Sequence, residues 1–321
     1  KKVMRFLPPA VTGPIIICIG LSLAPSAVSN ASTNWLLALI ALGVIVIFNI
    51  WGKGMFKIIP ILMGVVISYI AALIMHFAGM TNADGSAILN FSQAATDAVV
   101  GLPPFQLCKF DLTAILVMAP IAIATMMEHI GDIAAISATT GKNYIRDPGL
   151  NKTLMGDGLA TALAGLLGGP ANTTYGENTG VLALSRVYDP RVIRIAAVFA
   201  IIFSFCPKFA ALITAMPTAT IGGVSLILYG MISAVGVRNV VENKVDLTKS
   251  RNLIIAAVMF VSGLGFSSVG GITFTVGGAT ITHTALAIAA LAGVILNAIL
   301  PGKDYEFQQE SEGSTSVNFK V

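Results

Sequence analysis

The chain has 321 residues, of which 55% are hydrophobic and only 11% are charged. A soluble globular domain carries about 25% charged residues, so this composition excludes a soluble protein and indicates an integral membrane protein. The net charge of +4 does not indicate a nucleic-acid partner, because the basic residues lie in short clusters between apolar runs. Cys18, Cys108 and Cys206 are far apart, so we expect no disulfide framework, no metal site and no cofactor.

Apolar runs long enough to cross a bilayer as helices, which takes about 20 residues, occur ten times along the chain. These predicted crossings lie near residues 11–28, 34–50, 56–79, 112–136, 153–168, 171–187, 192–214, 217–237, 252–268 and 280–299. The fifth and sixth crossings are short and rich in glycine. Because these runs are long enough to cross the bilayer as helices, we expect an all-α polytopic membrane protein.

The lysines and arginines orient these crossings, because basic residues gather in cytoplasmic loops. Alternating the ten crossings places 17 of the 19 basic residues on one side and only Lys109 and Lys208 on the other. One crossing more or fewer would move whole clusters of basic residues to the other side of the membrane and remove this asymmetry. We therefore expect both ends of the chain to be cytoplasmic.

The sixth crossing is interrupted, since residues 168–189 read GGPANTTYGENTGVLALSRVYD. In hydrocarbon, non-helical backbone survives only where it is buried in protein or lines a cavity. Residues 171–175 favour a short strand, and a helix can resume at Gly176 or Glu177. This half-helix would turn free N–H groups and its positive dipole end toward a cavity. Such breaks indicate the polar substrate site of a transporter.

A lone strand at membrane depth needs a partner, and the sequence contains no second strand-like break. We expect the partner in a part of the protein that precedes this chain, which begins KKVMRFLPPAVTG without an initiator methionine or signal peptide. The alternative is that residues 168–180 form only a re-entrant turn or a packing kink. The carboxylate at the break favours the site.

Four acids fall within predicted crossings: Glu128, Asp132, Asp157 and Glu177. A charged side chain at a helix centre costs about 2.5–3.5 kcal/mol on insertion scales, so each should face the protein interior. Glu128 and Asp132 are four residues apart and share a helix face. Two carboxyls so close can hold a proton near neutral pH, as proton coupling requires. Alternatively, they only join two helices through hydrogen bonds.

Other candidates have a structural alternative that carries nearly equal or greater weight. Asp157 lies near the cytoplasmic end of its crossing and could be a helix cap. His129 is interpreted as a packed interface residue, because it lies about 100° around the helix from Glu128. Tyr175 and Tyr229 could stack on a planar ligand or simply pack in the core.

The motif NTTYGENTGVLALSRVYD resembles the signature of the nucleobase–ascorbate transporter family, the nucleobase:cation symporters. That signature is Gln, Glu or Pro, then Asn, any residue, Gly, four residues and Thr. Here it reads Glu177, Asn178, Thr179, Gly180, four residues and Ser185. YGEN resembles the uracil permease branch, as do EHIGD, LMGDGL, GGVSLILYG and VENKVD. The resemblance covers essentially residues 1–300.

The resemblance implies a fold of fourteen segments in two inverted repeats of seven, with a core domain (segments 1–4 and 8–11) and a gate domain (5–7 and 12–14). The ten crossings would be segments 5 to 14, and the third segment would supply the missing strand. The 321 residues alone are then expected not to transport. The implied domains are 1–80 (gate, first part), 81–110 (extracellular loop), 111–215 (core, second half), 216–300 (gate, second part) and 301–321 (cytoplasmic tail).

Carried over by motif, Glu177 would accept hydrogen bonds from pyrimidine N–H groups, and the backbone at Gly176 would donate to a carbonyl of the base. Glu128 would bind the base from the facing helix, whereas Tyr175 and Tyr229 would pack on it. The implied activity is proton-coupled uracil symport across a bacterial inner membrane. The implied partners are uracil, a proton, the lipid bilayer and a second copy of the chain, which forms a dimer through the gate domain.

Proton coupling would involve Glu128, Asp132 and Asp157, and the chain departs from the uracil pattern at the second of these. Uracil permeases commonly have His where this chain has Asp132, and Asp is more usual in purine carriers. A xanthine or other purine carrier is therefore the alternative. Ser185 in place of Thr keeps the hydroxyl.

Function classes other than symport fit less well. An anion carrier is disfavoured because Glu177 would repel an anion. An intramembrane hydrolase or metalloenzyme needs a metal-ligand pair or an activated nucleophile, and the sequence contains neither, so we expect no enzyme activity. A passive channel would predict uptake that a protonophore leaves unchanged.

Overall fold

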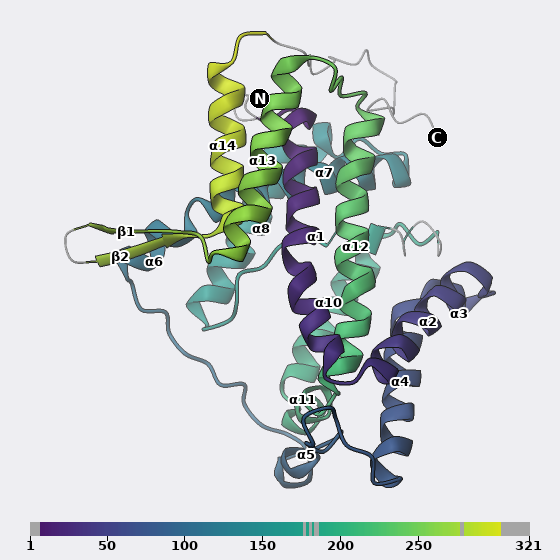
Figure 1. The fold of residues 1–321 in the computed structure, drawn as a ribbon. Coiled ribbons are helices and arrows are strands. Elements are labelled where there is room, and N and C mark those ends of the chain that lie inside the picture. Colours follow the sequence, from purple (N-terminus) through teal and green to yellow (C-terminus); the bar gives the residue numbers. More distant parts are fainter. Residues whose placement is uncertain (1–6, 176–177, 180–181, 183–185, 277–278, 303–321) are drawn as a thin grey trace. The chain divides into compact units, whose positions relative to one another are not determined.

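Helices make up most of the computed structural model (Figure 1). The structure describes residues 7–175, 178–179, 182, 186–276 and 279–302. The helices in the N-terminal half are α1 Pro9–Ser32, α2 Trp35–Trp51, α3 Met55–Ile58, α4 Pro60–Phe77, α5 Ser92–Thr96, α6 Leu112–Met118, α7 Ile121–Thr140, the π-helical turn Ile145–Gly149 and α8 Leu150–Leu166. The later elements are α10 Pro190–Ser204, α11 Pro207–Thr214, α12 Thr218–Glu242, α13 Ser250–Ser268, the strands β1 Ile272–Val276 and β2 Ala279–His283, and α14 Ala285–Ile299.

Helix starts follow the chemistry of the first turn. α4, α10 and α11 have proline at the first helical position, where a missing N–H costs no hydrogen bond. The side chain of Asn34 caps α2 by accepting from the backbone N–H of Leu37. Asp189 caps α10 by accepting from the N–H of Arg191. These caps satisfy donors that an apolar run would leave unpaired.

Five helical stretches are long and apolar enough to cross a membrane, namely α1, α4, Leu112–Ala134, α12 and α13. α10 and α11 together form a sixth candidate that is bent by 94°. α2 and α14 are apolar but shorter, with 17 and 15 residues. Nine of the ten predicted crossings coincide with helices, and the chain is a polytopic, nearly all-α membrane protein.

The sixth predicted crossing, near 171–187, differs from the others. Residues 169–175 leave the helix after α8, as expected, and they belong to no strand in the described part of the chain. The strand predicted there is therefore not paired within this structure. Gly176, Glu177, Gly180 and Ser185 lie outside the described residues, so the predicted half-helix is described only in fragments.

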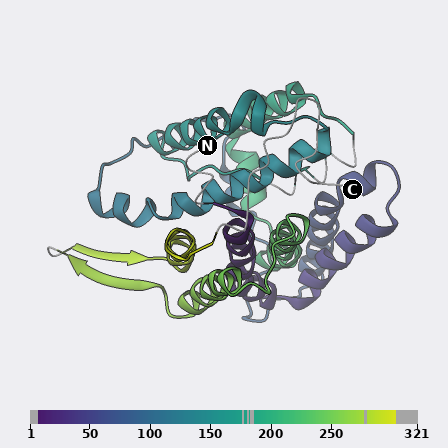
Figure 2. The same ribbon diagram turned by 90° about the horizontal axis from the view of Figure 1, so that it is seen from above.

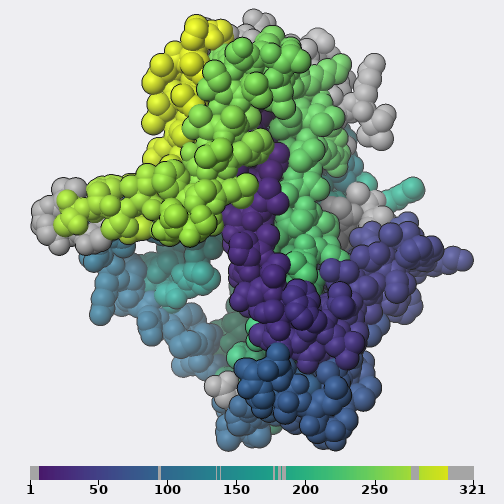
Figure 3. All heavy atoms as spheres, in the orientation of Figure 1, coloured from purple at the N-terminus to yellow at the C-terminus, as the bar shows by residue number. Residues whose placement is uncertain are grey.

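An antiparallel hairpin of β1 and β2 precedes α14, and its strands pair from Ile272 with His283 to Val276 with Ala279. The prediction that the last helix begins near residue 280 was therefore wrong, as was the prediction of no second strand-like segment. β-branched and aromatic residues on both sides of a Gly-Gly pair are typical of hairpins. Figure 3 shows the hairpin projecting from the helices of its unit.

The chain divides into two compact units, and each is described by itself. The first unit comprises Lys1–Ser22, Leu107–Thr179 and Tyr229–Val321. Its core joins buried side chains of α1, α7, α13 and α14, including Ile15, Met127, Ile255 and Met259. Figure 2 looks along α1 and α14 and shows α13 beside them. This packing holds α7, which carries the predicted site residues Glu128 and Asp132.

The second unit comprises Leu23–Gln106 and Gly180–Leu228. α2 packs along α4, and the start of α12 packs against both through Leu37, Ala41, Ile45 and Val224. Gly64 of α4 lets the side chain of Ile45 approach closely, because a Cβ there would meet it. Short side chains at such crossings bring membrane helices together.

Candidate functional site

Two acids of the first unit, Glu128 and Asp132, lie on α7, which begins where Pro120 interrupts the preceding helix. Proline has no N–H to donate, so the helix from Leu112 breaks after Met118 and restarts at Ile121. α7 then carries Glu128, His129 and Asp132. This placement confirms that Glu128 and Asp132 are one turn apart on one helix.

Both carboxyl groups of α7 are withdrawn from the surface. Asp132 is 5% exposed and Glu128 is half-buried, and each takes part in a hydrogen-bonding or electrostatic interaction. A carboxyl group in such a place must be paired or carry a proton, because a bare buried charge is costly. The pair therefore has the burial that the sequence predicts for acids inside a crossing.

α8 supplies the third acid of this unit. Asp157 lies in the middle of α8 and is half-buried, and the first turn of this helix contains no acid. The alternative that Asp157 is a helix cap is therefore wrong. α8 ends at Leu166, and Gly168 follows with φ +84°, a left-handed conformation that favours glycine. The chain then runs without helix through residues 169–175.

Two hydrogen bonds connect this non-helical stretch to α7 and α8. The hydroxyl of Thr161 on α8 donates to the carbonyl of Asn172 at 3.0 Å. Nδ1 of His129 on α7 lies 2.7 Å from Oγ1 of Thr174. The predicted break is therefore held against the two helices that carry the buried acids.

His129 is the residue that the sequence interpretation undervalued. Its side chain is 4% exposed, and Nδ1 lies 3.7 Å from Oδ2 of Asp157 as well as 2.7 Å from the hydroxyl of Thr174. Its position beside Glu128, inside a crossing, was the available signal. His129 thus lies where α7, α8 and the break meet, rather than at a purely apolar contact.

The remaining predicted residues are placed as follows. Tyr175 directly follows Thr174 and is exposed, and its carbonyl accepts from the N–H of Asn178 at 3.3 Å. Tyr229 lies on α12, where its carbonyl accepts from the hydroxyl of Ser233 at 3.2 Å, beside α1. The structure brings His129, Asp157 and Thr174 together but shows no such contact for Tyr229 in its described part.

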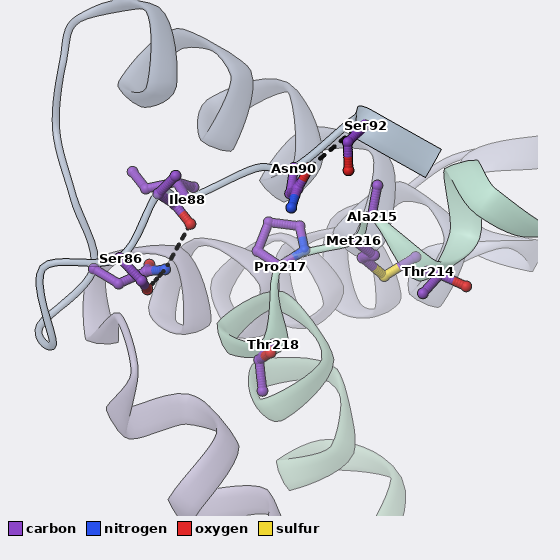
Figure 4. A pocket seen from close by; sticks show the side chains of 11 residues that line it. Ser86, Ile88, Asn90, Ser92, Thr214, Ala215, Met216, Pro217 and Thr218 are labelled. Carbon is purple, nitrogen blue, oxygen red and sulfur yellow. Dashed lines mark hydrogen bonds between the residues drawn. The ribbon is translucent and has the colours of Figure 1, made fainter. Parts of the chain in front are cut away.

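Two cavities lie elsewhere. One, of about 540 Å³, is mostly apolar and belongs to the first unit, between the α6–α7 break and the hairpin. The other, of about 380 Å³, belongs to the second unit, and Figure 4 shows its wall of hydroxyl and amide groups. Its polar lining residues are Asn82, Ser86, Asn90, Ser92, Thr214 and Thr218. Neither cavity contains a predicted site residue.

Among the described residues, no three His, Cys, Asp or Glu side chains come together as a metal-binding group. Within the same part of the chain, the buried side-chain polar atoms without a hydrogen-bond partner include Nε2 of His129 and Oγ1 of Thr173. Both belong to the cluster around the break. This cluster can therefore still accept or donate hydrogen bonds in a buried place.

Comparison with known proteins identifies similar chains. A family model described as "Permease family" matches residues 1–272. A "Probable uracil permease" of Haemophilus influenzae is 38% identical over 312 residues, which cover 94% of this chain and 70% of that protein. A "Uracil permease" of Bacillus subtilis is 40% identical over 329 residues, which cover 96% and 72%.

A more distant similarity is to a "Putative pyrimidine permease" of Escherichia coli. It is 36% identical over 312 residues, which cover 94% of this chain and 66% of that protein. All three relatives carry permease names, and two of the names specify uracil.

Proposed function

We propose that this chain, which belongs to the permease family, takes up uracil together with a proton by alternating access. The chain is a multi-pass membrane transporter and not an enzyme. The observation that carries the proposal is the meeting of α7, α8 and the non-helical stretch 169–175 at buried acids. The names of the uracil permeases support the choice of substrate.

The chemistry of uracil complements this site. Uracil is small, planar and uncharged, with two N–H donors and two carbonyl acceptors. In the proposed complex the carboxylate of Glu177 accepts from the N–H groups, and the backbone N–H at Gly176 donates to a carbonyl. Glu128 binds the base from α7, and Tyr175 and Tyr229 pack on its faces. Such a site discriminates well, because a wrong base leaves buried polar groups unpaired.

Proton coupling is assigned to Glu128, Asp132 and Asp157. Burial of Asp132 and Glu128 on one face of α7 favours a state in which the two share a proton. Exchange of that proton with the two sides of the membrane would link its gradient to substrate movement. Asn178, Gly180 and Ser185 support the local backbone in this proposal rather than contact the base.

The proposed setting is a bacterial inner membrane, with both ends of the chain cytoplasmic and the lipid bilayer around the helices. The distribution of basic residues supports this orientation. In the proposed working unit, a core part at 111–215 moves against gate parts at 1–80 and 216–300. Residues 81–110 form the outer loop and 301–321 the cytoplasmic tail, and two copies join through the gate parts.

One residue favours a second candidate substrate. Asp132 occupies the position where uracil permeases commonly carry His, and its carboxylate can accept a hydrogen bond that a purine offers. A xanthine or other purine symporter is therefore the alternative.

Uptake of labelled uracil separates these candidates. The protein is produced from its complete gene in cells that lack their own uracil carrier, with excess unlabelled uracil or xanthine as competitor. We expect uracil, but not xanthine, to block uptake, and a protonophore to abolish it. Block by xanthine would favour the purine alternative, whereas uptake that resists the protonophore would refute proton coupling.

A further inference from the structure

His129 lies in a polar cluster that packing alone does not require. Its side chain is 4% exposed, and its two ring nitrogens differ in environment. Nδ1 contacts the hydroxyl of Thr174, whereas Nε2 is buried without a partner in the part of the chain that the structure describes. A leucine of similar size would fill this space without burying an unpaired polar atom.

We propose that His129 is a positioning residue, which ties Asp157 of α8 to the stretch that leads into Glu177 and so sets the affinity for the transported base. The inference rests on the proposed function, because Glu177 is there the acceptor for the base. His129 itself touches no substrate in this proposal.

Nδ1 of His129 makes two interactions of different strength. Thr174 Oγ1 at 2.7 Å is within hydrogen-bond distance, whereas Asp157 Oδ2 at 3.7 Å is a charge neighbour just beyond it. The negative charge favours a proton on Nδ1, because the N–H then points at an anion as well as at a hydroxyl. Asp157 thereby selects the tautomer in which His129 donates to Thr174.

Besides the contact between His129 and Thr174, a second hydrogen bond holds the stretch 169–175. Thr161 lies four residues after Asp157, hence on the same face of α8, and its hydroxyl donates to the carbonyl of Asn172. Asn172 and Thr174 are thus both held, one through its backbone and the other through its side chain. The contact to Asn172 comes from Thr161 on α8, and the contact to Thr174 comes from His129 on the neighbouring helix α7.

In this proposal the contact at Thr174 acts on Glu177 through the chain, because the two residues are only three positions apart in the sequence. Three residues span at most about 10 Å when fully extended. In the proposal, a shift of Thr174 away from His129 would therefore displace the carboxylate that is proposed to bind the base. Loss of the tether should weaken binding more than turnover, since the groups that bind the base remain present.

Variants of His129 and Thr174 test this inference in the complete protein. His129→Leu keeps the volume and removes both nitrogens, whereas His129→Asn keeps a donor near the position of Nδ1. Thr174→Val and Thr174→Ser make the matched pair at the other end. KM and Vmax for uracil uptake are measured at equal membrane expression.

We expect His129→Leu and Thr174→Val each to raise KM about tenfold, the equivalent of one hydrogen bond. Vmax should change less than about twofold, and combining both variants should add little, because they remove the same contact. His129→Asn and Thr174→Ser should stay within about threefold of the wild-type KM. The opposite order, with His129→Leu tolerated and His129→Asn impaired, would show a packing role and overturn the inference.

A second readout is independent of the substrate. Hydrogen–deuterium exchange of the peptide that contains residues 171–175 is compared in purified wild type, His129→Leu and His129→Asn. Faster exchange in the leucine variant alone is expected, and Ser204→Ala, which removes a hydroxyl bonded only within α10, should leave it unchanged. Equal exchange in all variants would refute the tether. Wild-type protein without uracil uptake would instead refute the proposed function and leave this comparison intact.

Discussion

The hydroxyl of Ser68 on α4 lies 2.8 Å from the hydroxyl of Thr220 on α12, and neither side chain has any exposed surface. Ser68 also donates to the carbonyl of Leu37 on α2 at 3.0 Å. One serine therefore connects three helices of the second unit. These hydrogen bonds stabilise the unit because the hydroxyl groups are buried, and an unpaired hydroxyl in this place could not be hydrated.

Replacement of Ser68 should destabilise that unit. Ser68→Ala leaves the Thr220 hydroxyl without this partner, which costs about 1–3 kcal/mol. Thermal melting of the purified protein in detergent should show a lower midpoint. Ser32→Ala, which removes an exposed hydroxyl bonded within its own helix, should melt like the wild type. A Ser68→Ala midpoint equal to that of this control would contradict the connection.

Two glycines of α12 should respond differently to the same change. A Cβ at Gly223 would meet the backbone of Ala38, whereas a Cβ at Gly230 meets nothing within 4 Å. Gly223→Ala should destabilise the protein by about 1–3 kcal/mol, because backbone cannot rotate away. Gly230→Ala should be neutral or stabilising by up to about 1 kcal/mol, since alanine favours helix. Melting curves of the two variants compare them directly, and equal midpoints would count against this packing.

Neutralising the proposed acids should abolish transport without loss of expression. Glu128→Gln and Glu177→Gln keep the size of the side chain and remove the charge that is proposed to bind the base and the proton. Labelled uracil uptake should fall at least about a hundredfold, as when a charged partner is lost from a buried site. Glu242→Gln is the control, because Glu242 pairs with exposed Arg238 at 2.6 Å at the end of α12. Transport retained in both site variants would refute the proposed site.

The loop between α12 and α13 should contribute stability that depends on pH. The hydroxyl and the backbone N–H of Thr248 donate to Oδ1 of Asp246 at 2.6 and 2.9 Å, and these bonds lower the pKa of Asp246 from its ordinary 3.8. A lowered pKa means that the stabilisation is complete above the unfolded value and is lost as pH falls through the folded value.

The variant Asp246→Asn tests this dependence, because it cannot ionise. The wild type should melt higher than the variant at about pH 6, and the gap should close as the pH falls below about 4. Thr248→Val should remove the side-chain bond and reduce the same gap. A difference that stays constant across this range would show that ionisation of Asp246 does not matter.

Several features were predictable because they depend only on local sequence. Length and apolar character predict most of the long helices, since backbone groups in hydrocarbon must pair within their own segment. The interval of four residues places Glu128 and Asp132 on one face of α7. Glycine and proline near residue 170 predict the end of α8 before the stretch 169–175.

Other features escaped the sequence because they depend on contacts between distant segments. The hairpin before α14 was missed, since its residues are apolar enough to pass for the start of a helix. His129 was interpreted as a packing residue, because its partners Asp157 and Thr174 are 28 and 45 residues away along the chain.

By itself, the sequence determined that this is a membrane transporter of many helices, with buried acids on α7 and α8 and a break after them. The length of an apolar run and the cost of burying a charge are local properties of the sequence, and they leave few alternatives for where helices and buried acids lie. Only the tertiary structure decided which polar atoms meet: Nδ1 of His129 with Thr174, and Ser68 with Thr220. Hydrogen bonds act over about 3 Å, so a shift or rotation of one helix that no periodicity reveals makes or breaks them.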